Sequence, residues 1–145
     1  MASSDKTITV FITAGEPSGD SLGAALMRAL TEKHAGNVRF AGVGGEQMEA
    51  AGLKSIFPMV DLSVMGLLEV VPRLNRILKR IQQTADKVCE LEPDIFITID
   101  APDFSTRVAD KVHKQCKNKP LMAHYVAPTV WAWRPERAAK FAGLY

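Results

Sequence analysis

Apolar residues along the chain follow two kinds of pattern. Four runs are almost uninterrupted by polar side chains, as expected of strands buried on both faces of a sheet; they span 7–14, 38–43, 94–99 and 121–126. Other stretches repeat apolar residues every three or four positions, which predicts amphipathic helices at 21–34, 67–91 and 105–116, with a short helix at 46–51. A strand at 53–57 and the beginning of another within 141–145 complete the expected elements.

The order of these elements predicts the fold class. Helices that separate successive strands require crossover connections, so we expect an α/β fold with a doubly wound, mostly parallel sheet. A chain of 145 residues corresponds to one such domain, which we place at 6–145. In open parallel sheets ligands bind beyond the carboxyl ends of the strands. The loops after Ala14, Val43, Ile99 and Val126 are therefore the candidate positions for chemistry.

Composition narrows the function classes. With 18 Lys and Arg against 16 Asp and Glu, the net charge of +2 is too small to predict a nucleic-acid partner. No run approaches the ~18 consecutive apolar residues that span a bilayer, so any membrane contact would be peripheral, and no secretory signal is visible. The two cysteines, Cys89 and Cys116, form no CxxC pair and have no histidine at ligand spacing. We therefore expect neither a disulfide nor a zinc site, and a reducing compartment.

The loop at 15–20 has the sequence GEPSGD and lies where a phosphate-binding loop would lie. It matches neither GxGxxG nor the lysine-containing phosphate loop, and Glu16 and Asp20 put negative charge where a diphosphate would bind. A tight turn explains Gly19, and a helix cap explains Asp20. Glu16 has two interpretations that the sequence leaves open: it accepts hydrogen bonds from sugar hydroxyls, or it is a solvated loop side chain.

Two carboxylates follow the hydrophobic strand at 94–99. Asp103 is explained as the cap of the next helix, whereas no capping role is visible for Asp100. Asp100 is therefore our candidate for a general base. No metal site is predicted, because these clustered acids have simpler explanations.

The segment 124–135 contains both tryptophans of the chain. Aromatic faces beside a cation and a hydroxyl suit a glycan or an amphipathic ligand, although the tryptophans could also simply form a wall of the domain. The candidates are Thr129, Trp131, Trp133 and Arg134. His124, within a predicted strand, is interpreted as a hydrogen-bonded core histidine.

The first half of the long helix has more apolar residues than one face that packs on the sheet requires. The excess residues are Leu68, Val70, Val71, Leu74, Ile77 and Leu78, and the opposite face carries Arg73, Arg76, Lys79 and Arg80. This combination predicts attachment to an anionic membrane surface. An ordinary amphipathic helix is the alternative, and it is the preferred interpretation of 81–91.

Four motifs together, GEPSGD, SVMGLLEV, PDIFITIDAPDF and HYVAPTVWAWRPER, resemble those of the lipid-A-disaccharide synthase family, in order and along nearly the whole chain. The resemblance implies a Rossmann-like amino-terminal half of a two-domain (GT-B type) inverting glycosyltransferase. Such enzymes join UDP-2,3-diacylglucosamine to 2,3-diacylglucosamine 1-phosphate through a β-1,6 bond and release UDP. It also implies a cytoplasmic enzyme of Gram-negative bacteria, peripheral on the cytoplasmic face of the inner membrane, without a cofactor.

Residue roles follow from the same resemblance. Asp100 corresponds to the proposed general base and Glu16 to an essential glutamate. The substrate-binding candidates are Gly15, Ser18, Gly19, Asp103, Thr129, Trp131, Trp133 and Arg134. Family members are more than twice as long, and their carboxyl-terminal domain supplies most nucleotide contacts, so we expect this chain to be inactive alone. The motifs do not indicate an oligomeric state.

Two other function classes remain open at this stage. A non-catalytic lipid-binding or interaction module would bind a ligand without turning it over. A nucleotide-dependent oxidoreductase or kinase is disfavoured by the acids of the loop at 15–20.

Overall fold

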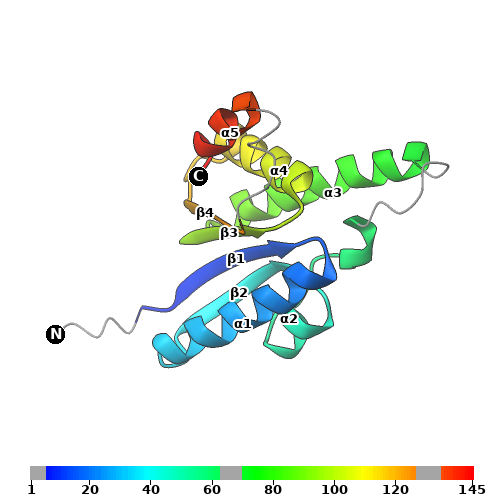
Figure 1. The fold of residues 1–145 in the computed structure, drawn as a ribbon. Coiled ribbons are helices and arrows are strands. Elements are labelled where there is room, and N and C mark those ends of the chain that lie inside the picture. The colour runs from blue at the N-terminus through cyan, green and yellow to red at the C-terminus, as the bar shows by residue number, and fades with distance from the viewer. Residues whose placement is uncertain (1–5, 63–69, 127–134) are drawn as a thin grey trace.

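A computed structural model describes residues 6–62, 70–126 and 135–145 (Figure 1). Its centre is a sheet of four strands: β1 (Ile8–Ala14), β2 (Val38–Val43), β3 (Ile95–Ile99) and β4 (Leu121–Tyr125). All pairings between these strands are parallel, and their order across the sheet is β2-β1-β3-β4. The predicted doubly wound α/β class is confirmed.

Helices cover both faces of the sheet, as Figure 1 shows. One face carries α1 (Pro17–Lys33) and the short α2 (Glu46–Ala50). The other carries α3 (Val70–Leu91) and α4 (Pro102–Gln115), and α5 (Pro135–Ala142) packs over β4 on this face through Phe141. A 3-10 turn, η1 (Met59–Leu62), precedes α3.

The alternation of side chains along each strand divides the core into two clusters, one on each face of the sheet. Phe11 and Phe96 lie on the face covered by α3 and α4, where their rings meet edge to face with centroids 5.7 Å apart. Val10, Ile12 and Ile97 lie on the face covered by α1 and α2. Both faces of β1 and β3 are buried, which explains why their sequences are nearly continuous in apolar residues.

Two helices begin earlier than the sequence predicts. Both α1 and α4 have proline at their first position, where the missing N–H leaves no hydrogen bond unmade and the fixed φ suits a helix. Glu16, not Asp20, therefore precedes α1, and Ala101, not Asp103, precedes α4. The expected starts at 21 and 105 are wrong because a proline at the first helical position begins each helix before the expected cap.

Two expected strands are absent from the described part of the chain. The segment 53–57 makes one isolated bridge, between Gly42 and Ser55, and no ladder. Residues 141–145 contain the end of α5 and a turn, and Leu144 packs into the core there.

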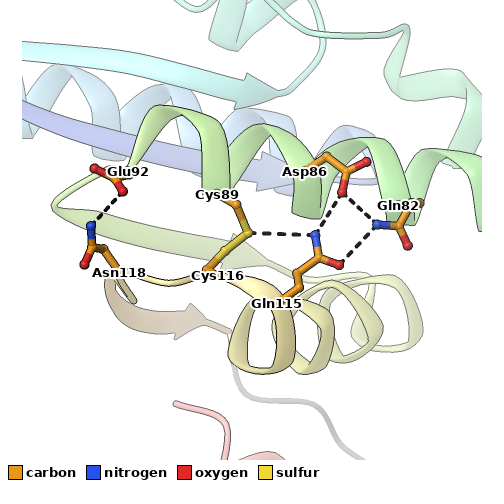
Figure 2. The surroundings of a disulfide bond; sticks show 7 residues. All are labelled: Gln82, Asp86, Cys89, Glu92, Gln115, Cys116 and Asn118. Atoms are coloured by element: carbon orange, nitrogen blue, oxygen red, sulfur yellow. Dashed lines mark hydrogen bonds between the residues drawn. A yellow bond between two sulfur atoms is a disulfide. The ribbon is translucent and has the colours of Figure 1, made fainter.

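The prediction that the cysteines stay unpaired is also wrong, because Cys89 and Cys116 form a disulfide (Figure 2). Cys89 lies near the end of α3, Cys116 follows the end of α4, and their Cα atoms are 4.9 Å apart. The two helices pack side by side in the same direction, which brings their carboxyl ends together. Gln115 donates hydrogen bonds to Asp86 and to the Cys89 sulfur beside the bond. A search for CxxC spacing misses this pairing.

Candidate functional site

The carboxyl edge of the sheet brings the loops after β1 and β3 into contact, because these strands are neighbours. A Cβ atom on Gly15 would lie 2.8 Å from the Cβ of Ala101, closer than real Cβ atoms approach. A Cβ on Gly19 would lie 3.3 Å from the Cβ of Ala14 and 3.7 Å from that of Asp100. The missing side chains of these two glycines therefore let the first loop pack directly against the Asp100 loop.

Asp100 follows β3 in a left-handed backbone conformation, with φ of 53°, and Ala101 continues it with φ of 43°. Such conformations are unfavourable for residues with a Cβ, and they persist where surrounding contacts impose them. The Asp100 carbonyl accepts a hydrogen bond from the Ser105 hydroxyl at 2.8 Å, and its N–H donates to the Tyr125 carbonyl at 3.4 Å.

The Asp100 carboxylate is half-buried, and the Ser18 hydroxyl donates to its Oδ2 at 3.3 Å. Ser18 lies in the first turn of α1, so this bond joins the two loops through side chains. Among the residues that the structure describes, Ser18 is the one donor to this carboxylate, so its other oxygen lone pairs can accept a proton or a hydrogen bond from a ligand.

Glu16 and Asp103 are both exposed. Glu16 occupies the position before α1, and its side chain makes no capping hydrogen bond. Asp103 lies in the first turn of α4 and likewise caps nothing, so its predicted capping role is wrong. Both carboxylates therefore face solvent at the same edge as Asp100.

Asp20 is 5% exposed and has a structural role that the sequence did not predict. Its carboxylate accepts hydrogen bonds from the N–H groups of Gly45, Gln47 and Met48 at 2.8, 3.0 and 3.0 Å. It therefore caps α2 rather than its own helix. These hydrogen bonds connect α1 to the loop after β2.

A row of polar residues lies beneath this edge, on the face covered by α3 and α4. Thr13, Thr98 and His124 stand side by side on β1, β3 and β4. His124 Nδ1 lies 2.7 Å from Thr98 Oγ1, which confirms that this histidine is hydrogen-bonded, although it is half-buried at the margin of the core. Burial lowers the pKa of His124, against the opposing effects of the Val126 carbonyl and the Asp100 carboxylate. Periodicity alone did not single out this row.

The predicted aromatic segment lies outside the described residues, including Thr129, Trp131, Trp133 and Arg134. Leu68 also lies outside them, and the side chains of Val70 and Val71 are not described. In the described part of α3, Leu74 and Leu78 are 49% and 44% exposed, whereas Ile77 is partly buried against the core. The preferred interpretation of 81–91 is confirmed by the burial of Ile81, Ala85 and Val88.

The cations of α3 differ in how freely they face solvent. The Arg80 guanidinium donates to Asp61 Oδ2 at 2.6 and 2.9 Å and lies over the Phe57 ring, so it is held against the protein. Arg76 lies 3.9 Å from the same carboxylate and is more exposed. Among the residues that the structure describes, no helix is long and apolar enough to cross a membrane.

Two further observations bound the site. Within 6–62, 70–126 and 135–145, no three acidic, histidine or cysteine side chains cluster as metal ligands would. A groove of about 950 Å³ lies between β2 and α3, but none of the candidate catalytic or sugar-binding residues lines it. The position of this groove therefore does not identify the candidate site.

The part of the chain that contains the four motifs is similar to proteins of known family. The sequence model of the lipid-A-disaccharide synthetase family matches residues 10–145. The chain belongs to this family. The lipid-A-disaccharide synthases of Rhodospirillum centenum, Ruegeria pomeroyi and Pseudomonas putida are 54%, 53% and 51% identical to it, over 94%, 94% and 92% of its length.

These alignments cover 34%, 33% and 34% of the three relatives, so the chain spans about a third of their length. Within this part of a lipid-A-disaccharide synthetase fold, the structure brings Asp100, Ser18, Gly15 and Gly19 into one contact region. It places Glu16 exposed on the residue before α1.

Proposed function

We propose that this chain is the acceptor-side, amino-terminal domain, residues 6–145, of a glycosyltransferase that makes the lipid A disaccharide. The donor is UDP-2,3-diacylglucosamine, the acceptor is 2,3-diacylglucosamine 1-phosphate, and the products are the β-1,6-linked disaccharide and UDP. The family match supports this reaction. The observation that carries the site is the Asp100 carboxylate, which stands at the carboxyl edge of the sheet with one long hydrogen bond to Ser18.

In the proposed mechanism Asp100 removes the proton from the 6-hydroxyl of the acceptor. The oxygen then attacks the anomeric carbon of the donor from the face opposite UDP, so that the configuration inverts and UDP leaves with the bonding electrons. The same use of a carboxylate to activate an attacking oxygen occurs in glycoside hydrolysis. This displacement needs no cofactor.

The remaining candidates bind the sugars in this proposal. The exposed Glu16 carboxylate accepts hydrogen bonds from sugar hydroxyls, and Ser18 orients Asp100. The glycines keep the backbone of the first loop close to the ligand. Further contacts come from Asp103, Thr129, Trp131, Trp133 and Arg134.

A hybrid enzyme tests the proposed reaction. This chain is joined to the carboxyl-terminal two-thirds of the Rhodospirillum centenum relative, and UDP release is measured with both acylated sugars. We expect release that depends on both substrates, and none from this chain alone. A folded hybrid that binds an acylated sugar without releasing UDP favours the binding-module alternative. Binding of NAD or ATP by this chain alone favours an oxidoreductase or a kinase.

We also propose that α3 attaches the protein to the cytoplasmic face of the inner membrane. Leu74 and Leu78 expose about half of their surface one helical turn apart, beside the exposed cations Arg76 and Lys79. Apolar insertion combined with basic residues near anionic lipid gives reversible binding. The acylated substrates reside in a bilayer, which makes such attachment useful.

Sedimentation with phosphatidylglycerol vesicles tests the attachment. Serine at both Leu74 and Leu78 should lower the bound fraction several-fold while the unfolding temperature stays unchanged, because both side chains are exposed. Leu121→Ser on β4 is the matched control, since Leu121 is 70% exposed on another surface. Equal loss in the control, or unchanged binding of the double variant, contradicts attachment through α3.

A further inference from the structure

A chain of hydroxyl groups connects the buried polar row to the backbone of Asp100. Thr98 Oγ1 donates to Tyr145 Oη at 2.8 Å, and Tyr145 Oη donates to the Ser105 carbonyl at 3.3 Å. The Ser105 hydroxyl in turn donates to the Asp100 carbonyl at 2.8 Å. The Tyr145 hydroxyl thus joins Thr98 of β3 to the backbone of α4 at Ser105, the residue whose side chain binds the Asp100 carbonyl.

The hydrogen bonds between these hydroxyl groups are all donated in the same direction. Each hydroxyl has one proton, so the Tyr145 proton is used on Ser105 and the Thr98 proton on Tyr145. Thr98 Oγ1 therefore accepts from His124 Nδ1, 2.7 Å away. This order links the side chains of His124, Thr98 and Tyr145, and it commits the protons of both hydroxyl groups.

We propose that the hydroxyl groups of Tyr145 and Thr98 position Asp100 for accepting the proton of the acceptor hydroxyl. The inference rests on the proposed function, in which Asp100 is the base. Two consecutive left-handed residues, Asp100 and Ala101, need contacts from several sides to persist, and the Tyr145 hydroxyl joins two of the elements that supply them. Without it, the first turn of α4 loses its link to Thr98 of β3 and keeps only the bonds of Ser105 to the Asp100 and Ala101 carbonyls.

Two observations separate this role from simple packing. The Tyr145 ring already packs against His124 and Phe141, with centroids 5.4 and 4.8 Å away, so a phenylalanine would fill the same space. Burial raises the pKa of Tyr145 to about 12, so its hydroxyl stays protonated as a donor throughout the neutral range. What Tyr145→Phe removes is therefore the hydrogen-bond link.

Kinetics of the hybrid enzyme test the positioning role. Tyr145→Phe and Thr98→Val should each lower kcat roughly tenfold to a hundredfold, with KM within about twofold, because a misplaced base slows the chemical step. Thr98→Ser, which restores the hydroxyl, should recover most of the rate. Tyr125→Phe is the matched control, since this exposed tyrosine is outside the hydroxyl chain. Unchanged kcat in Tyr145→Phe overturns the proposal.

Amide hydrogen exchange on this chain decides the same question without activity. In Tyr145→Phe, the amides of Asp100 and Ser105 should exchange about tenfold faster, while the amides between β1 and β2 keep their rates. An equal increase at all amides, or none, means that the hydroxyl contributes only general stability and overturns the proposal. An inactive wild-type hybrid refutes the proposed function instead, and leaves this measurement to decide the positioning role.

Discussion

Asp20 and Asp100 stand at the same edge of the sheet and use their oxygens differently. The Asp20 carboxylate is almost completely buried, and three backbone N–H groups donate to it. The Asp100 carboxylate is half-buried, and the Ser18 hydroxyl donates to it over 3.3 Å. The backbone differs as well, because Asp20 lies within α1 whereas Asp100 is left-handed.

This difference separates a carboxylate that holds the fold from one that is available for chemistry. Buried N–H groups must be paired, so the acceptors of Asp20 are committed before any ligand arrives. Within 6–62, 70–126 and 135–145 the Asp100 carboxylate receives only the long Ser18 bond, and its strained backbone points to a constraint other than stability. A position at the end of a strand therefore identifies candidate catalytic carboxylates. Whether their oxygen lone pairs already accept backbone hydrogen bonds distinguishes the structural ones from those available for chemistry.

The largest expected effect is on the Asp100 side of the comparison. Asp100→Asn keeps the shape of the side chain and tolerates the left-handed backbone, but it cannot take a proton. In the hybrid enzyme we expect kcat to fall by about 10² to 10⁴, as for loss of a general base, with little change in KM or in unfolding temperature. UDP release and circular dichroism melting measure these quantities. More than about a third of wild-type turnover would remove Asp100 from the role of base.

The fold was largely predictable from the sequence because hydrophobic patterns follow burial. β1 and β3 are buried on both faces, so their apolar runs are easy to recognise in the sequence. Because the two strands are parallel neighbours, the loops that follow them lie at the same edge of the sheet. The segment 53–57 has a similar local pattern but forms one bridge with Gly42 and no strand. Whether an apolar run completes a ladder depends on its neighbours, which periodicity does not show.

The site was predictable where a residue type and a strand end coincide, as at Asp100. It was not predictable where the partner is distant in sequence. Asp20 caps a helix that begins 26 residues later, Tyr145 reaches Thr98, and Cys89 pairs with Cys116. In each case local spacing suggested a nearer partner or none.

The second prediction concerns stability on the Asp20 side. Asp20→Ala leaves three backbone N–H groups without their acceptor, and we expect the free energy of unfolding to fall by about 3 kcal/mol. Asp103→Ala is the matched control, because that exposed carboxylate accepts no capping bond, and its effect should stay within about 0.5 kcal/mol. Urea unfolding of this chain measures both. Equal effects in the two variants would contradict the structural role of Asp20.

A third carboxylate, Asp94, has the smallest expected effect on the free energy of unfolding. It measures what a single backbone N–H donor contributes when the carboxylate is near solvent. Asp94 precedes β3 at the opposite edge of the sheet, where its Oδ2 accepts from the Thr9 N–H at 2.9 Å and its Oδ1 from Lys6. The Thr9 N–H, followed by Lys6, lowers the pKa of Asp94 below its ordinary value. The side chain is 37% exposed, so solvent screens the interaction and we expect a few tenths of a kcal/mol.

The sign of the pH dependence follows from this lowered pKa. The stabilisation is present above the pKa of the unfolded chain, about 3.9, and is lost as the pH falls through the lower pKa of the folded protein. Wild-type protein should therefore lose slightly more unfolding free energy between pH 7 and pH 2 than Asp94→Asn does. Asp110, whose pKa is lowered mainly by Lys114, separates the two causes. The difference in pH dependence between wild type and Asp110→Asn should vanish in 1 M salt. The difference between wild type and Asp94→Asn, which comes from the backbone hydrogen bond, should keep most of its size. If the pH dependence of Asp94→Asn matches that of wild type, one backbone N–H near solvent contributes nothing measurable, and burial alone separates Asp20 from the other acids.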